Sequence, residues 1–172
     1  EFRRVLFRST EFGTHSDALI ADAYEHATTL FFEGSLQRAS HYVLRGAIET
    51  SGADYGFVGF VADEALRVYA WSGLEWDPAH TSGLIEDVDR AYSRDGYVDF
   101  RGEDNLFMRV ITEGRTVIED DRVGRGGKAL PHGHPPLTSF IGVPYIHSGR
   151  AQAMIGVGRS HGPFALGSER VV

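Results

Sequence analysis

Residues 138–157 constrain the fold most strongly, because they predict two paired strands joined by a tight turn. Along residues 138–145 the side chains alternate between two faces, Thr138, Phe140, Gly142 and Pro144 on one and Ser139, Ile141, Val143 and Tyr145 on the other. Residues 147–150 then supply a turn, and residues 153–157 return as an apolar antiparallel partner. The stretch from Lys128 to Phe164 therefore predicts a stiff Pro/Gly loop, a buried strand, a turn and a second strand.

Composition limits the class of protein. The 172 residues fit one domain, and 42% hydrophobic with 24% charged residues is typical of a globular chain. No apolar run approaches the ~20 residues of a membrane span, so we expect no membrane insertion and a cytoplasmic location. The net charge of −7 argues against a nucleic-acid partner. The absence of cysteine excludes disulfides, thiolate metal ligands and cysteine nucleophiles from these residues.

Three segments are expected along the chain. Residues 1–9 resemble the read-through translation of a sequencing adapter, and we expect them to be an artefactual N-terminus. Residues 10–34 predict a linker or signalling helix, and residues 35–172 predict the domain proper. Ser168 is a favourable N-cap for a helix that has completed only its first turn at Val172, so we expect this C-terminal helix to be truncated.

The remaining helices and strands are predicted from the spacing of apolar residues and from the glycines that end them. Helices are expected over about 17–32, from 36 to about 50, from 84 to about 95, and over 106–113. The first carries the stripe Leu19, Ala23, Ala27, Leu30 and Phe31, and the second carries Leu36, Ala39, Val43 and Ala47. Strands are expected over 55–61, 66–71 and 116–118, whereas residues 100–102 read as loop. Residues 120–137, with four glycines and three prolines, predict a functional or disordered loop.

This order of elements, and several short motifs within it, resemble the GAF domain of bacterial signalling proteins. The motifs are Asp104-Asn105-Leu106-Phe107, residues 117–121 (VIEDD), 131–137 (PHGHPPL), 139–144 (SFIGVP), 156–159 (GVGR) and 162–164 (GPF). The resemblance covers residues 35–172. It implies an α+β fold in which a central antiparallel sheet carries helices on both faces. It also implies a pocket between the sheet and the segments that connect its strands.

The resemblance narrows the chemistry as well. Bilin-binding members and the GAF-type methionine sulfoxide reductases work through cysteine, which this chain lacks. The signature of the cyclic-nucleotide-binding members is also missing. His132 and His134 invite a metal hypothesis, but two residues apart in a proline-flanked loop is not a standard ligand spacing. We expect His134 to hold the loop by hydrogen bonds, and we expect no metal and no cofactor.

A small-molecule pocket is the better hypothesis for a functional site. Pockets are mostly apolar with a few placed polar groups. The candidate ligand-binding residues have that character: Tyr69, Trp71, Phe100, Arg109, His134 and Phe140. Phe57, Phe107 and Phe140 are expected to serve mainly as core, whereas Trp71, Phe100, Arg109 and His134 are the stronger pocket candidates. No nucleophile elbow, HExxH motif or Walker loop is present, so no catalytic residue is predicted.

The sequence therefore predicts a sensory GAF domain of a larger signalling protein, such as a sensor histidine kinase or a diguanylate cyclase/phosphodiesterase. A small molecule of unknown identity would close the long loop, and the flanking helices would transmit the change. We also expect a homodimer through the terminal helices. The main alternative is a ligand-free dimerisation and spacer module in which only the terminal helices act. A stand-alone enzyme on the same fold is a weaker alternative.

Overall fold

The computed structural model describes residues 14–74, 84–101, 106–120 and 134–164. Its helices are α2 (Thr14–Phe32), α3 (Leu36–Ser51), α4 (Leu84–Asp95) and α5 (Leu106–Glu113). Its strands are β1 (Tyr55–Ala62), β2 (Ala65–Ser72), β3 (Val98–Phe100), β4 (Val117–Asp120), β5 (Ser139–His147) and β6 (Arg150–Arg159). The predicted artefactual residues 1–9 and the predicted C-terminal helix lie outside the described residues, as does most of the predicted loop.

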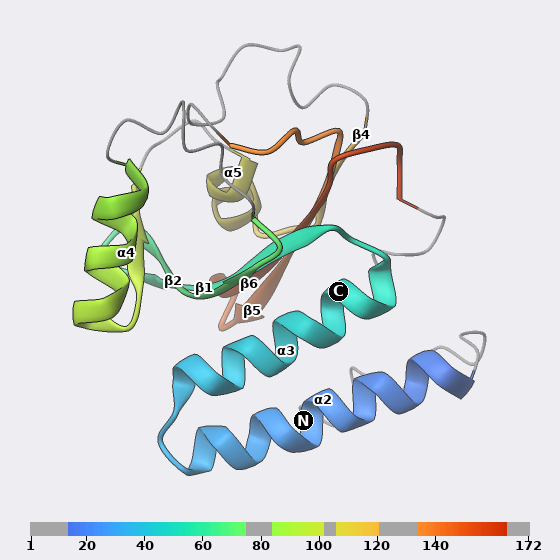
Figure 1. Ribbon diagram of the computed structural model, residues 1–172, viewed down its shortest axis with the longest axis horizontal. Helices are drawn as coiled ribbons and strands as arrows, with labels where there is room; N and C mark the ends of the chain where they lie inside the picture. Colours follow the sequence, from blue (N-terminus) through green and yellow to red (C-terminus); the bar gives the residue numbers. More distant parts are fainter. Residues whose placement is uncertain (1–13, 75–83, 102–105, 121–133, 165–172) are drawn as a thin grey trace.

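The strands form one sheet in the order β3-β2-β1-β6-β5-β4, and every neighbouring pair is antiparallel. Helix α3 covers one face of the sheet and α2 lies outside α3, while α5 covers the opposite face (Figure 1). Helix α4 stands at the end of the sheet formed by β2 and β3 (Figure 1). The predicted α+β architecture, with a central antiparallel sheet and helices on both faces, is confirmed.

Helix α3 is buried on two sides because it lies between α2 and the sheet. Ala39 packs with Ala27 and Leu30 of α2, whereas Leu44 packs on Val58 and Ala70 of the sheet. The stripe predicted for α3 includes members of both faces, with Ala39 toward α2 and Ala47 toward the sheet, and it omits Leu44. The stripe predicted for α2 was wrong at Phe31, which is 60% exposed. One neighbouring helix covers only one side of α2, and Phe31 lies about 100° around the helix from Leu30.

Two hairpins give the sheet its register. Asp63 and Glu64 between β1 and β2 both adopt positive φ, as do Ser148 and Gly149 between β5 and β6. A two-residue turn with this backbone matches the twist of antiparallel strands, so it fixes their pairing. The predicted pairing of residues 138–145 with residues 153–157 is confirmed. The prediction of loop at Phe100 was wrong, because Val98–Phe100 pairs with Leu66–Val68 as the edge strand β3.

The sheet separates two apolar cores. The core under α3 contains Leu44, Ala47, Val58, Ala70, Ile141 and Val157. The core under α5 contains Leu66, Val68, Val110, Val117, Phe140 and Met154. None of the helices in the described ranges is both long and apolar enough to cross a membrane.

Candidate functional site

The face of the sheet under α5 carries a group of half-buried rings, here called the aromatic cluster: Phe57, Trp71, Phe100 and Phe107. Phe57 and Trp71 are direct cross-strand partners on β1 and β2, and Phe100 pairs with Leu66 across β2 and β3. Phe107 of α5 contacts Phe57 and Phe100 edge to face, with ring centroids 5.7 Å and 6.1 Å apart. Edge-to-face packing is a favourable aromatic geometry, so the cluster is an ordered apolar surface.

Glycines give these rings room on the same face. A Cβ atom at Gly156 of β6 would lie 2.6 Å from two ring atoms of Phe57 and 3.1 Å from Phe140. A Cβ atom at Gly158 would lie 2.5 Å from the ring of Tyr55. Aromatic rings therefore occupy the space that side chains on β6 would otherwise fill, so rings line this face of the sheet.

The structure brings three of the six predicted binding residues into one place. Trp71, Phe100 and Phe140 all contribute to the core under α5. Phe140 is 4% exposed and lies beneath the other rings, which matches the core role expected for it. Trp71 and Phe100 are half-buried at its margin, where a ligand could reach their rings.

Tyr69 does not join this group. The β1–β2 register passes from Val58 opposite Ala70 to Gly59 opposite Val68, so Tyr69 is the extra residue of a β-bulge. Its ring packs edge to face on Phe60, which lies in the core under α3, with centroids 5.6 Å apart. A regular strand would place residues 69 and 71 on the same face, and the bulge separates them. Tyr69 and Trp71, both candidate pocket residues, therefore lie on different faces of the sheet.

Arg109 lies on α5 beside the edge strand β4, and two carboxylates already engage it. Its Nη1 donates to Glu119 Oε1 at 2.6 Å, and its Nε lies 3.5 Å from Glu113 Oε1. The hydrogen bond to Glu119, with the added field of Glu113, raises the pKa of the Arg109 guanidinium. This network ties α5 to β4, which gives Arg109 a structural function at the border of the candidate site.

His134 lies just before β5 and packs edge to face against Tyr55, with centroids 5.9 Å apart. Its Nδ1 lies 2.6 Å from the carbonyl oxygen of Pro135, and burial lowers its pKa and favours the neutral imidazole. The hydroxyl of Tyr55 donates to the carbonyl oxygen of Pro136 at 2.7 Å, and burial raises the Tyr55 pKa. Both rings hold the segment that enters β5, the loop-holding role expected for His134.

Within the described ranges, no three His, Asp or Glu side chains are grouped so as to hold a metal ion. His132 lies outside those ranges.

Tyr92 of α4 is a residue that the sequence did not single out for function. Tyr92 follows helical spacing with Val88, a pattern that by itself indicates only an apolar stripe on this helix. Its ring lies against Trp71, with centroids 4.3 Å apart, and its hydroxyl group reaches Tyr69 and His41. A tyrosine at a core-facing helical position carries a hydroxyl that needs a partner, and this is the signal that could have identified it.

One antiparallel sheet lies between α3 and α5, which is an α+β fold, and comparison with known proteins identifies the family. The family model described as "GAF domain" matches residues 33–171, so this chain belongs to the GAF domain family, whose fold is regulatory and sensory. No curated protein matches the chain at the level of sequence.

Solved structures share the fold at low sequence identity. The GAF domain of a phosphoenolpyruvate-protein phosphotransferase from Coxiella burnetii is 14% identical, with a TM-score of 0.67 over 90% of this chain and 83% of that one. The corresponding Acinetobacter domain is 13% identical, with a TM-score of 0.66 over 92% and 86%. A free methionine-R-sulfoxide reductase from Neisseria meningitidis is 10% identical, with a TM-score of 0.61 over 94% and 85%. At these identities the likeness establishes the fold alone.

Proposed function

We propose that this chain is a non-catalytic regulatory GAF domain that binds a small, ring-containing molecule at the aromatic cluster. The observation that carries the proposal is the exposure of the cluster. Phe57, Trp71, Phe100 and Phe107 are only half-buried, although they border a fully buried core. Half-buried rings offer surfaces on which a ligand ring can stack, and aromatic side chains are common in the lining of ligand sites.

The charges around the cluster favour an uncharged or weakly polar ligand. Arg109 is the only cation among the predicted binding residues, and Glu119 and Glu113 engage it. Recognition would therefore rest on stacking and on apolar burial, which scale with the contact area of the ligand.

Catalysis has little support. The Neisseria meningitidis reductase was solved in complex with its substrate, so a related fold can hold a small molecule. This chain has no cysteine for the thiol chemistry expected of such reductases. A place in a cytoplasmic sensor histidine kinase or diguanylate cyclase/phosphodiesterase is part of the proposal, and the sequence of the full gene would test it.

A thermal-shift screen tests whether the aromatic cluster binds a small molecule. The panel consists of uncharged heterocycles, aromatic amino acids and nucleobases, each added to the full chain. A compound present at 100 times its Kd stabilises the native state by about 2.7 kcal/mol. For a chain of this size that raises Tm by roughly 5–10 °C. We expect Trp71→Phe to reduce the shift produced by a bound compound.

Ile118→Thr is the matched control for this screen. Ile118 is exposed on β4 and pairs with Ile141, whose side chain lies in the core under α3. Its substitution should leave the ligand-induced shift unchanged. A compound that shifts wild type and Trp71→Phe equally binds elsewhere and contradicts the proposed site.

A ligand-free dimerisation module is the second candidate, and exposed rings on α2 favour it. Phe31 and Phe32 are 60% and 82% exposed at the end of this helix, and Tyr24 is also exposed. Apolar rings gathered on an exposed helix are typical of an association surface. If α2 pairs with its copy, light scattering should show a dimer that Phe32→Ser shifts toward monomer. The neighbouring substitution Glu33→Ser should leave the dimer intact, and a monomeric wild type would contradict this function.

A further inference from the structure

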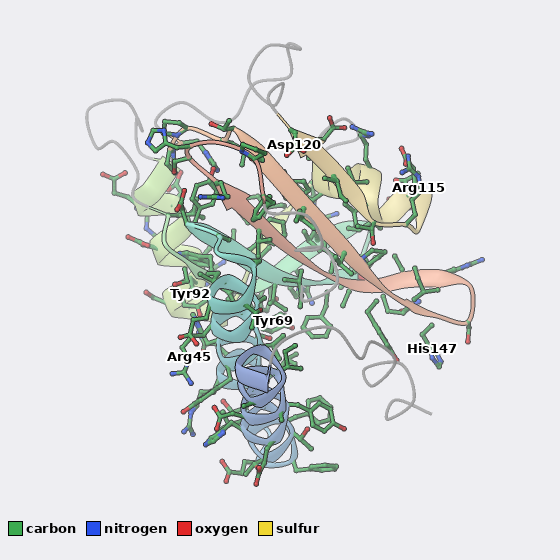
Figure 2. All side chains as sticks on the ribbon, turned by 90° about the vertical axis from the view of Figure 1, so that its right-hand side faces the viewer. Arg45, Tyr69, Tyr92, Arg115, Asp120 and His147 are labelled. Carbon is green, nitrogen blue, oxygen red and sulfur yellow. The ribbon has the colours of Figure 1, made fainter. Side chains whose placement is uncertain are left out.

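Tyr92 of α4 contacts two other elements, β2 and α3, on the side of the sheet where Figure 2 places Tyr69 and Tyr92. Its ring lies on Trp71 of β2, and its hydroxyl oxygen lies 3.0 Å from the carbonyl oxygen of Tyr69. The same hydroxyl lies 3.1 Å from Nε2 of His41 on α3. We infer that Tyr92 couples the aromatic cluster on one face of the sheet to helix α3 on the other. The inference rests on the proposed function in one respect only: a ligand bound at the aromatic cluster would be what displaces Trp71.

The backbone of β2 makes this contact possible. Strand β3 pairs with Leu66–Val68 of β2 and ends there, so β3 does not pair with residues 69–72 of β2. Tyr69 is the extra residue of the bulge in the pairing with β1. Because a bulged residue leaves the regular ladder, its carbonyl is available to a side chain. The hydroxyl of Tyr92 satisfies this carbonyl from α4.

The single proton of the Tyr92 hydroxyl sets the direction of both hydrogen bonds. The hydroxyl donates that proton to the Tyr69 carbonyl, so toward His41 it acts as an acceptor. His41 must then donate from Nε2, which selects the Nε2–H tautomer of the neutral ring. The imidazolium form also carries a proton on Nε2, so the bond survives protonation. A change in the position of Tyr92 therefore alters both hydrogen bonds together.

Trp71 connects the aromatic cluster to these two hydrogen bonds, because its indole contacts both the core and Tyr92. One side of its indole joins the apolar core under α5, and the ring of Tyr92 lies against it at 4.3 Å. Displacement of the indole would displace the Tyr92 ring, and hydrogen bonds weaken steeply as their angle departs from linear. The other contacts of α3 with the sheet, through Leu44 and Ala47, are apolar and non-directional. The Tyr92–His41 bond is thus a directional link from the site to α3.

Nuclear magnetic resonance of the full chain tests this link without any ligand. Trp71→Phe serves as the perturbation of the cluster, and Tyr92→Phe removes the hydroxyl while keeping the ring. The imidazole nitrogen shifts of His41 are the readout. We expect the Nε2–H tautomer in wild type and a change in the His41 shifts in Trp71→Phe. In the Tyr92→Phe background the same Trp71→Phe substitution should leave the His41 shifts unchanged.

His147 is the internal control, because it lies at the tip of the β5–β6 hairpin, away from α3 and α4 (Figure 2). Its shifts should be constant in all four proteins. Tyr92→Phe alone should also speed amide exchange around His41 roughly fivefold, the loss expected for one hydrogen bond.

Equal His41 changes with and without the Tyr92 hydroxyl would overturn the inference, as would unchanged His41 shifts in Trp71→Phe. Because no ligand enters this experiment, an empty thermal-shift screen would count against the proposed function and leave the coupling intact. A compound that binds at the cluster, together with His41 shifts that contradict the coupling, would remove the inference and leave the proposed ligand site intact.

Discussion

Gly73→Ala is expected to lower the free energy of unfolding by at least about 3 kcal/mol, the sum of a backbone and a packing penalty. Gly73 follows β2 with a φ of +75°, a conformation that an L-residue adopts at a cost. A Cβ atom there would overlap the carbonyl oxygen of Asp54 and lie 2.9 Å from Cα of Tyr55. For a chain of this length the loss corresponds to a fall in Tm of roughly 6–12 °C.

Asp54 cannot move aside to admit the new methyl group. Its backbone N–H donates to the carbonyl oxygen of Gly158 at 3.0 Å, and its carboxylate accepts from the N–H of Ser160 at 2.7 Å. These bonds fix the start of β1 to the end of β6. Gly149→Ala is the matched control, because Gly149 has a φ of +76° with no atom within 4 Å of the added Cβ. It should cost only about 1 kcal/mol, and equal Tm losses in the two variants would contradict the packing argument.

The sequence predicts an element of this fold well where the apolar pattern of that element matches the faces that it buries. Residues 138–145 are predicted as a strand with two distinct faces, and the turn at residues 147–150 predicts its antiparallel pairing with β6. Helix α3 is predicted with one apolar stripe because small residues are also buried on it: Gly46 faces Ala23 of α2, and Ser40 and Ser51 are buried as well. Such residues look polar or neutral in a sequence and are buried here by close packing. Edge strand β3 was missed because three residues with one partner strand leave almost no periodic pattern.

The candidate site was harder to predict, because it depends on which face each side chain occupies. Trp71 and Phe100 both pack against the core under α5, although the sequence predicts loop at residues 100–102. Tyr69 was misplaced because a bulge reverses the alternation and has no sequence signature in β2. Arg109 was expected to face a ligand, but carboxylates one helical turn away and on β4 neutralise it. Periodicity cannot reveal a partner such as Glu119, which is distant in sequence.

Gly142→Ala tests how closely helix α5 packs against the sheet. Gly142 lies on β5 beneath α5, and a Cβ atom there would lie 2.5 Å from Cγ2 of Val110 and 2.8 Å from Cε1 of Phe140. Val110 is fully buried and Phe140 is 4% exposed, so neither side chain can turn toward solvent. Overpacking of this kind costs about 1–3 kcal/mol. We therefore expect Gly142→Ala to lower the free energy of unfolding by that amount, measured by guanidinium chloride denaturation as a downward shift of the midpoint.

The double variant Gly142→Ala/Val110→Ala separates overpacking from a general intolerance of alanine in β5. Val110→Ala alone leaves a cavity and should cost about 2 kcal/mol. In the double variant the new methyl group enters the space that Val110 vacates, so the combined loss should fall below the sum by at least about 1 kcal/mol. Val98, which is buried on β3 at the other edge of the sheet, provides the control. Val98→Ala should add to Gly142→Ala without coupling, and an equally additive Val110 pair would show that α5 moves freely over β5.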